Sequence, residues 1–236
     1  MMDGLHQREI AVPRWRHMLG LCLRMLGVLA LLVGLVALAT KPARAHPHVW
    51  VTAHAEVLFD ESQRIAGLRH IWTFDEFYSA WAIQGLEEDY GAVGPAQLRE
   101  LAELNATSLV EFGYFTEARI DGRDRDFAPP VDYDMVYEDG QLTLSFTLPL
   151  RAPARPRTAL VMEIYDPTFF VSFAIDKGDD AVRLVGGPQG CAKTITRPRS
   201  SEIVATASLS EAFFETLSAS SDFGEQFANR ALIACP

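Results

Sequence analysis

The chain has 236 residues, enough for one large domain or two small ones, with 31 Asp and Glu against 21 Lys and Arg. Residues 1–45 hold six of the basic and two of the acidic residues, so the remainder carries 15 against 29, a formal net charge of −14. This acidic balance argues against nucleic acid or an anionic membrane as the partner, and it is compatible with binding of cations.

The first 45 residues are typical of an export signal. A basic stretch precedes an apolar run over residues 25–39, and the small residues Ala43 and Ala45 then supply a cleavage site. The run is shorter than the roughly 20 apolar residues that cross a bilayer, so no stable membrane anchor is expected after cleavage. We predict cleavage after Ala45 and a periplasmic domain over residues 46–236.

The start of this domain is predicted to be a β-hairpin followed by two helices. Apolar and polar residues alternate over 48–59, a turn follows, and 64–73 forms the second strand. Aromatic residues at helical spacing predict a helix over 74–86. An acidic break then leads to a second helix over about 95–104, which has Pro95 in its first turn.

The rest of the chain is rich in predicted strands. Asp139-Gly140 is typical of a hairpin turn, residues 149–156 suggest a loop, and residues 209–217 suggest a short helix. Strands are expected over 112–120, 131–138, 141–148, 159–165, 169–175, 181–185 and 191–196, while 227–235 fits either a helix or a strand. The fold class is α+β: one strand-rich domain with antiparallel sheets and two helices inserted after the first hairpin.

The cysteines fit an exported protein. Cys22 leaves with the signal, and Cys191 and Cys235 remain as an even pair without the spacing of a redox or zinc motif. We expect them to form a disulfide that ties the end of the chain to the domain.

All four histidines of the exported domain lie within residues 46–70, and imidazole is the commonest metal ligand. At about 3.3 Å per residue along a strand, His48 and His54 lie about 20 Å apart and cannot share an ion. His46 and His48 lie two residues apart on one face. A turn centred near Ser62 would place His54 opposite His70. We therefore expect two histidine pairs.

Carboxylates and the new amino terminus can add further ligands. Asp75 or Glu76 can complete the second pair, and Asp166 is a more distant candidate. Cleavage before His46 would leave a free amine beside its imidazole. Pro47 has no amide N–H, which blocks the square-planar amino-terminal copper and nickel motif. Nitrogen ligands of this kind suit Ni, Co, Zn or Cu.

Structural roles are the alternative for these residues. A histidine in a strand also serves as a hydrogen-bonded structural residue, and five aromatic residues near the first hairpin are expected in the core: Trp50, Trp72, Phe74, Phe77 and Trp81. The chain contains none of the common hydrolase, metalloprotease, P-loop or dinucleotide motifs, so we do not expect an enzyme.

Four motifs in this order resemble the exported domain-of-unknown-function-1007 family: His46-Pro-His-Val-Trp-Val, Ile71-Trp-Thr-Phe-Asp-Glu-Phe-Tyr-Ser, Phe112-Gly-Tyr-Phe-Thr and Tyr165-Asp-Pro-Thr-Phe-Phe-Val. The resemblance implies a periplasmic component of an uncharacterised ABC-type transport system that accompanies nickel or cobalt transporters. The motif positions that it carries over are His46, His48, His54, His70, Asp75 and Asp166. Many members have an Asp/Asn/Gly-rich loop after the first helix, which residues 87–94 replace here, so a cation role for that loop is doubtful.

Two functions follow as hypotheses. In the first, a periplasmic accessory protein binds Ni, Co, Zn or Cu through its N-terminal histidines and serves an inner-membrane metal transporter. In the second, an interaction module with structural histidines docks a membrane transporter without binding metal.

Overall fold

The computed structural model describes residues 25–28, 47–199, 206, 209, 211–217 and 223–236. The chain divides into two compact units, Met1–Arg44 and Ala45–Pro236. The predicted cleavage site and His46 lie outside the described residues, and in the first unit only 25–28, which are helical, are described. Within these described ranges, no helix combines the length and the apolar character needed to cross a membrane.

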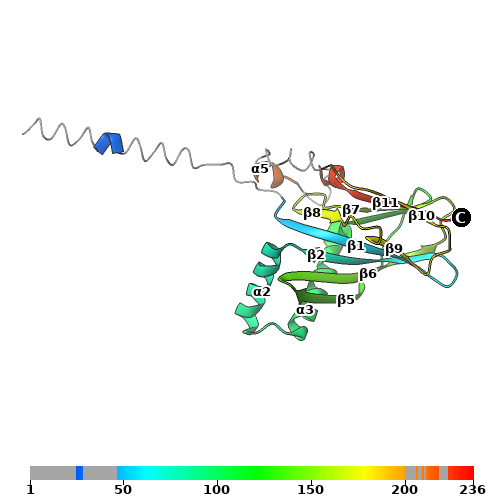
Figure 1. Cartoon of the computed structure of the whole chain (residues 1–236), viewed down its shortest axis with the longest axis horizontal. Coiled ribbons are helices and arrows are strands. Elements are labelled where there is room, and N and C mark those ends of the chain that lie inside the picture. Colours follow the sequence, from blue (N-terminus) through cyan, green and yellow to red (C-terminus); the bar gives the residue numbers. More distant parts are fainter. Residues whose placement is uncertain (1–24, 29–46, 200–205, 207–208, 210, 218–222) are drawn as a thin grey trace, which may run out of the picture. The chain divides into compact units, whose positions relative to one another are not determined.

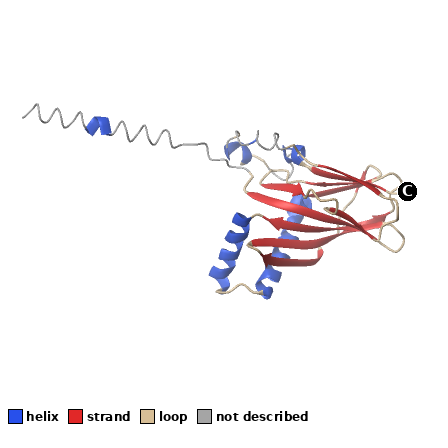
Figure 2. Ribbon diagram, in the orientation of Figure 1, coloured by secondary structure: helices blue, strands red, loops and turns tan. Residues whose placement is uncertain are grey.

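The second unit is α+β, as predicted, with two sheets and helices grouped mainly after the first hairpin (Figures 1 and 2). The first sheet contains β1 (Val49–Phe59), β2 (Ile65–Phe74), β5 (Val131–Glu138), β6 (Gln141–Ala154), β8 (Val171–Ile175) and β9 (Val182–Val185). The second contains β3 (Thr116–Ile120), β4 (Arg123–Asp124), β7 (Leu160–Ile164), β10 (Ala192–Thr196) and β11 (Asn229–Ala234).

The strand order of the first sheet is β5-β6-β2-β1-β8, with β9 also on β1, and that of the second is β10-β11-β7-β3-β4. The sheets are mainly antiparallel, as predicted, and the exception is that β8 and β9 run parallel to β1. The reason is that β7 belongs to the second sheet. The chain crosses to the first sheet after β7 and then enters beside β1 in the same direction.

The core lies between the two sheets. Alternate residues of β1 point inward, as their period of two predicts, and Val51, Ala53 and Val57 are at most 2% exposed. Trp72 of β2 contacts the rings of Phe115, Phe146 and Phe173. Of the five aromatic residues expected in the core, only Trp72 and Phe74 are buried, whereas Trp50, Phe77 and Trp81 are 49%, 87% and 69% exposed.

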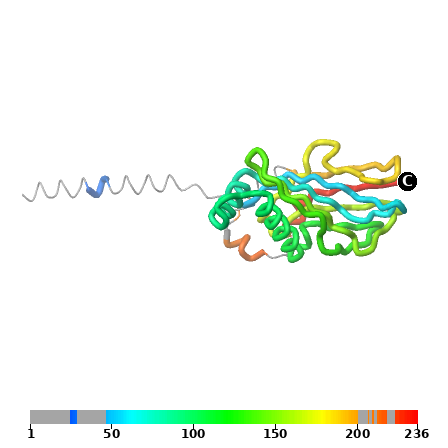
Figure 3. The backbone as a smooth tube through the Cα atoms, turned by 90° about the horizontal axis from the view of Figure 1, so that it is seen from below, coloured from blue at the N-terminus to red at the C-terminus, as the bar shows by residue number. Residues whose placement is uncertain are grey.

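The two inserted helices are α2 (Glu76–Tyr90) and α3 (Pro95–Ser108), and α3 packs against β5 (Figure 3 shows both helices from below). The acidic residues 87–89, expected to break the helix, continue α2. The helix ends at Gly91, whose backbone φ of 78° suits a residue without a side chain. On α3, which begins at Pro95 as expected, the buried residues are Ala102 and Ala106, while Leu104 is exposed.

Residues 112–115, expected in a strand, belong instead to the 3-10 segment η1 (Leu109–Phe115). Gly113, Tyr114 and Phe115 have φ values of 58°, 58° and 48°, a left-handed turn that no periodicity predicts. The expected loop over residues 149–156 is also wrong in part, because β6 continues to Ala154 and pairs with β2 around a register irregularity.

The end of the chain returns to the second sheet. After the short helices α5 (Glu211–Phe214) and η2 (Phe223–Phe227), β11 lies between β10 and β7. The predicted disulfide between Cys191 and Cys235 is present. Phe169, Phe214 and Phe227 form a separate small apolar cluster beneath α5 and η2.

Candidate functional site: an apolar cavity

The register of the first hairpin contradicts the expected second histidine pair. His54 lies opposite Ile71, and His70 lies opposite Ala55. The pairing shifts between Leu58 and Phe59, and a slip of one residue moves a side chain to the other face of the sheet. His54 therefore lies on the outer face, where its Nε2 is 3.6 Å from Asp176 Oδ2, and His70 is fully buried.

His70 has a structural environment. Its Nε2 lies 3.2 Å from Thr116 Oγ1, and that hydroxyl donates to the carbonyl oxygen of Tyr114 at 2.8 Å. Because the hydroxyl hydrogen is used there, His70 Nε2 carries the proton and donates to Thr116. Nδ1 is left without a partner among the described residues, and burial lowers the pKa of His70 to about 3. A neutral imidazole thus helps to hold the left-handed turn of η1.

Asp75 caps α2. Its Oδ1 accepts the N–H groups of Phe77 and Tyr78 at 2.9 and 3.0 Å, and its Oδ2 accepts the N–H of Trp50 at 2.9 Å. Carboxylates at this position satisfy backbone donors that have no partner within the helix. Asp75 is far better explained as a helix cap that ties α2 to β1 than as a ligand shared with His70.

Asp166 organises the crossing from β7 to β8. Its Oδ1 accepts the backbone N–H and the hydroxyl of Thr168, both at 2.8 Å, and its Oδ2 accepts the N–H of Val171 at 2.8 Å. The side chain is 3% exposed, and the three donors compensate the burial of its carboxylate.

His48 is exposed at the start of β1, and its ring stacks on Phe170 at 4.8 Å. Its predicted partner, His46, lies outside the described residues. Over the part of the chain that the structure describes, no three His, Cys, Asp or Glu side chains are placed to share an ion. The six predicted ligands are therefore dispersed, apart from the undescribed neighbourhood of His46 and His48.

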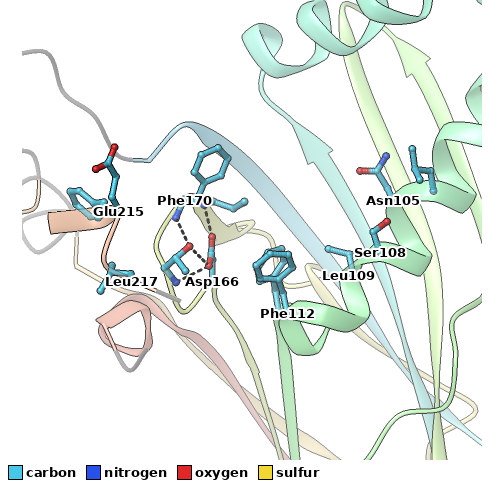
Figure 4. Close-up of a pocket in the computed structure, with 13 residues that line it drawn as sticks. Asn105, Ser108, Leu109, Phe112, Asp166, Phe170, Glu215 and Leu217 are labelled. Atoms are coloured by element: carbon cyan, nitrogen blue, oxygen red, sulfur yellow. Dashed lines mark hydrogen bonds between the residues drawn. The ribbon is translucent and has the colours of Figure 1, made fainter. Parts of the chain in front are cut away.

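Residues of the third and fourth sequence motifs meet elsewhere, around an apolar cavity of about 620 Å³. One wall comes from the end of α3 and from η1, the other from residues 166–171, and α5 with the residues after it completes the lining. Figure 4 shows Asn105, Ser108, Leu109 and Phe112 on the first wall and Asp166 and Phe170 across from them. The lining residues are Leu104, Asn105, Ser108, Leu109, Phe112, Phe115, Asp166, Thr168, Phe170, Val171, Phe214, Glu215 and Leu217.

A second cavity of about 200 Å³ extends this site inward. The two share five lining residues, Asn105, Leu109, Phe115, Phe170 and Val171. The inner part adds residues from the first two motifs and from the sheet, namely Val49, Val51, Trp72, Phe74, Tyr78, Leu144 and Phe173. All four motifs thus contribute to the lining of these two adjacent apolar cavities.

The polar groups of this site are few. Trp72 is 2% exposed, and its indole N–H has no acceptor among the described residues. Asn105 uses its amide N–H to bond the carbonyl of Leu101 at 2.8 Å. Burial raises the pKa of Tyr78, which keeps its hydroxyl neutral. Pockets that bind small molecules have this character, with an apolar lining and a few polar groups.

A separate polar depression of about 500 Å³ lies near β3 and β4. Three arginines, Arg119, Arg125 and Arg151, line it together with three carboxylates, Glu117, Asp124 and Asp126. Because these charges balance, the depression selects neither cations nor anions.

The sequence did not predict the cavity, because the residues that line it come from segments far apart in the chain. The motif aromatics Phe112 and Phe170 were visible, but their periodicity predicted ordinary strands. Asn105, Ser108 and Leu217 lie outside every motif and reach the site only through the packing of α3 and the return of the chain after α5. The exposure of Phe112 and Phe170, at 40% and 47%, appears only in three dimensions.

Comparisons with known proteins agree with the motif resemblance. No solved structure matches the chain. An uncharacterised 15.5 kDa protein in the trpE 3′ region of Spirochaeta aurantia is 27% identical over 109 residues, which are 44% of this chain and 78% of that protein. The model of the family described as "protein of unknown function (DUF1007)" matches residues 31–235. The chain therefore belongs to this family of unknown function.

Proposed function

We propose that the exported domain is a non-catalytic binding module that holds an apolar ligand in the two joined cavities and serves a membrane transporter in the periplasm. One observation carries the proposal: residues of all four motifs line two adjacent apolar cavities of about 620 and 200 Å³ that share five lining residues. This volume lies within the roughly 300–1,000 Å³ of small-molecule pockets. The arrangement favours the interaction module over the metal carrier.

The chemistry of the lining supports binding rather than catalysis. Ser108 and Thr168 are the hydroxyl side chains of the outer cavity, and no histidine, lysine or cysteine is among its described lining residues. The carboxylate of Asp166 already accepts three hydrogen bonds. A nucleophile with an adjacent base, which covalent catalysis needs, is not assembled by these described side chains.

A neutral apolar dye tests the proposal. N-phenyl-1-naphthylamine should bind the exported domain with one-to-one stoichiometry and increased fluorescence. Ser108→Trp narrows the cavity and should weaken binding about tenfold or more, a loss of about 1.4 kcal/mol. Thr107→Trp adds the same ring at the neighbouring exposed position, which does not line the cavity, and should bind the dye like the wild type.

A second variant guards against misfolding as the cause. Leu217→Asp places a charge in the part of the lining that follows α5 and should also weaken binding, while the circular dichroism spectra of all variants match. Unchanged dye affinity in both Ser108→Trp and Leu217→Asp would exclude this cavity as the binding site.

Metal capture by His46 and His48 is a second candidate function, with an inner-membrane metal transporter as recipient. The observation in its favour is the exposed His48 imidazole, two residues beyond the predicted terminus. Native mass spectrometry of the exported chain with Ni, Co, Zn and Cu should then give one bound ion, which His46→Ala/His48→Ala removes and His54→Ala retains. Equal metal content in all three proteins would reject this function.

A further inference from the structure

We infer that the cavity takes an amphiphile with an apolar body and a polar end that is neutral or positively charged, and that it discriminates against anions such as fatty acids. The inference rests on the proposed function and names the class of ligand. The charges around the outer cavity and the apolar lining of the inner cavity support it.

The charged lining residues are all acidic. Asp166 and Glu215 line the outer cavity, and no Lys, Arg or His is among the described residues that line either cavity. Asp166 is nearly buried, whereas Glu215 is exposed and can meet the polar end of a ligand. An anionic head group would therefore lie near carboxylates without a compensating cation.

The surrounding sequence has the same sign. Between Arg199 and Arg230 the chain contains no basic residue and five acidic ones: Glu202, Glu211, Glu215, Asp222 and Glu225. This segment includes α5 and the residues after it, which form one side of the cavity. Any charge that this segment brings to the site is therefore negative.

The inner cavity accounts for the apolar body. Apart from Asn105 and the hydroxyl of Tyr78, its lining consists of hydrocarbon and aromatic groups, and it extends to Trp72. Burying an alkyl chain here is favourable because it removes apolar surface from water. A charged group would lose its hydration in the same place. The apolar end therefore enters first, and the polar end stays near Glu215.

Three ligands with the same chain and different head groups test the charge preference. Decylammonium, decanol and decanoate would compete against N-phenyl-1-naphthylamine at low salt. We expect decylammonium to bind about tenfold more tightly than decanoate, with decanol between them, because the exposed carboxylate adds a modest interaction. Glu215→Gln should reduce the ratio of the decylammonium affinity to the decanoate affinity about threefold. Glu138→Gln, which makes the same charge change at an exposed residue of β5, should leave this ratio unchanged.

A brominated ligand tests the orientation. Trp50→Phe/Trp81→Phe leaves Trp72 as the single tryptophan of the exported domain, and both replaced residues are exposed. Decylammonium with bromine at its far end should quench Trp72 fluorescence, because that end lies in the inner cavity. Quenching that is absent at saturating ligand would overturn this orientation.

The outcomes separate this inference from the proposed function. If the neutral dye does not bind in the cavity, the proposed function fails. If the dye binds and decanoate competes as well as decylammonium, only the ligand class is wrong. If the dye binds and none of the three alkyl ligands competes, the cavity is made for another occupant, such as an apolar side chain of a protein partner, and the inference is overturned.

Discussion

At His70 the protein buries an imidazole completely, between the rings of Trp72 and Phe146. The ring donates to Thr116, which in turn donates to Tyr114 in the left-handed turn of η1. That turn presents Phe115 to both cavities. A single histidine thus connects the core of the sheet to the wall of the binding site, and its protonation state affects folding.

The stability of the protein should depend on pH through this residue. Burial lowers the pKa of His70 to about 3 from 6.5, so the unfolded state takes up a proton below pH 6.5 while the folded state stays neutral. The free energy of unfolding should therefore fall as the pH decreases, by about 2 kcal/mol between pH 8 and pH 5 from this group. Urea unfolding at both pH values measures the difference.

His70→Gln keeps a donor for Thr116 and should remove this pH-dependent part. His54→Gln, on the outer face of the same hairpin, should retain it. If the free energy of unfolding of the His70→Gln protein falls by the same amount between pH 8 and pH 5, groups other than His70 cause the pH dependence.

Among the elements, α2 depends on one carboxylate for its start. Asp75 accepts two N–H groups of the first turn and the N–H of Trp50, so it fixes both the helix and its attachment to β1. The buried positions of α2 are only Ser79 and Ile83, and Ser79 Oγ accepts the N–H of Leu142 at 2.9 Å. With so little apolar burial, the polar contacts at the helix start carry much of the stability of α2.

Asp75→Ala should therefore destabilise the domain by about 2 kcal/mol, the upper part of the range for a lost N-cap, because three donors lose their acceptor. Asp75→Asn should destabilise the domain clearly less than Asp75→Ala, because asparagine also caps helices. Glu76→Ala, an exposed change in the same turn, serves as the control. Urea unfolding curves that coincide for Asp75→Ala and Glu76→Ala would contradict this role.

At the scale of the whole molecule, the chain crosses repeatedly between two sheets and is closed by a disulfide. Cys191 directly precedes β10, and Cys235 directly follows β11. The bond closes a chain segment that includes α5 and η2, and with them Phe214 and Phe227 of the small apolar cluster. It therefore restrains the part of the chain that completes the cavity.

Removing the bond with Cys191→Ser/Cys235→Ser should lower the free energy of unfolding by about 3–4 kcal/mol, as expected for a closed loop of this length. Denaturant unfolding of the variant and of the oxidised and reduced wild type measures the effect. The reduced wild type should behave like the variant, and the oxidised wild type should be more stable than both. Equal stability of all forms would show that the bond does not stabilise the folded domain.

Local patterns predicted much of the fold. Alternation along β1, the turn residues Asp139-Gly140 and the even cysteine pair each depend on neighbouring residues or on a simple count, and all are confirmed. The predicted register of the first hairpin is wrong because an irregularity between Leu58 and Phe59 shifts the pairing by one residue. The strand predicted over residues 112–115 is wrong because Tyr114 and Phe115 adopt a left-handed conformation that their side chains do not favour.

The sequence by itself determined the α+β class, most strand positions, the acidic character and the family, because these follow from periodicity, composition and ordered motifs. Only the tertiary structure decided that His54 and His70 lie on opposite faces, that Asp75 and Asp166 are occupied by backbone donors, and that the four motifs line two adjacent cavities. The physical reason is that a binding site depends on which distant segments pack together. That choice is made by the whole core, which buries Trp72 and Phe115 between two sheets.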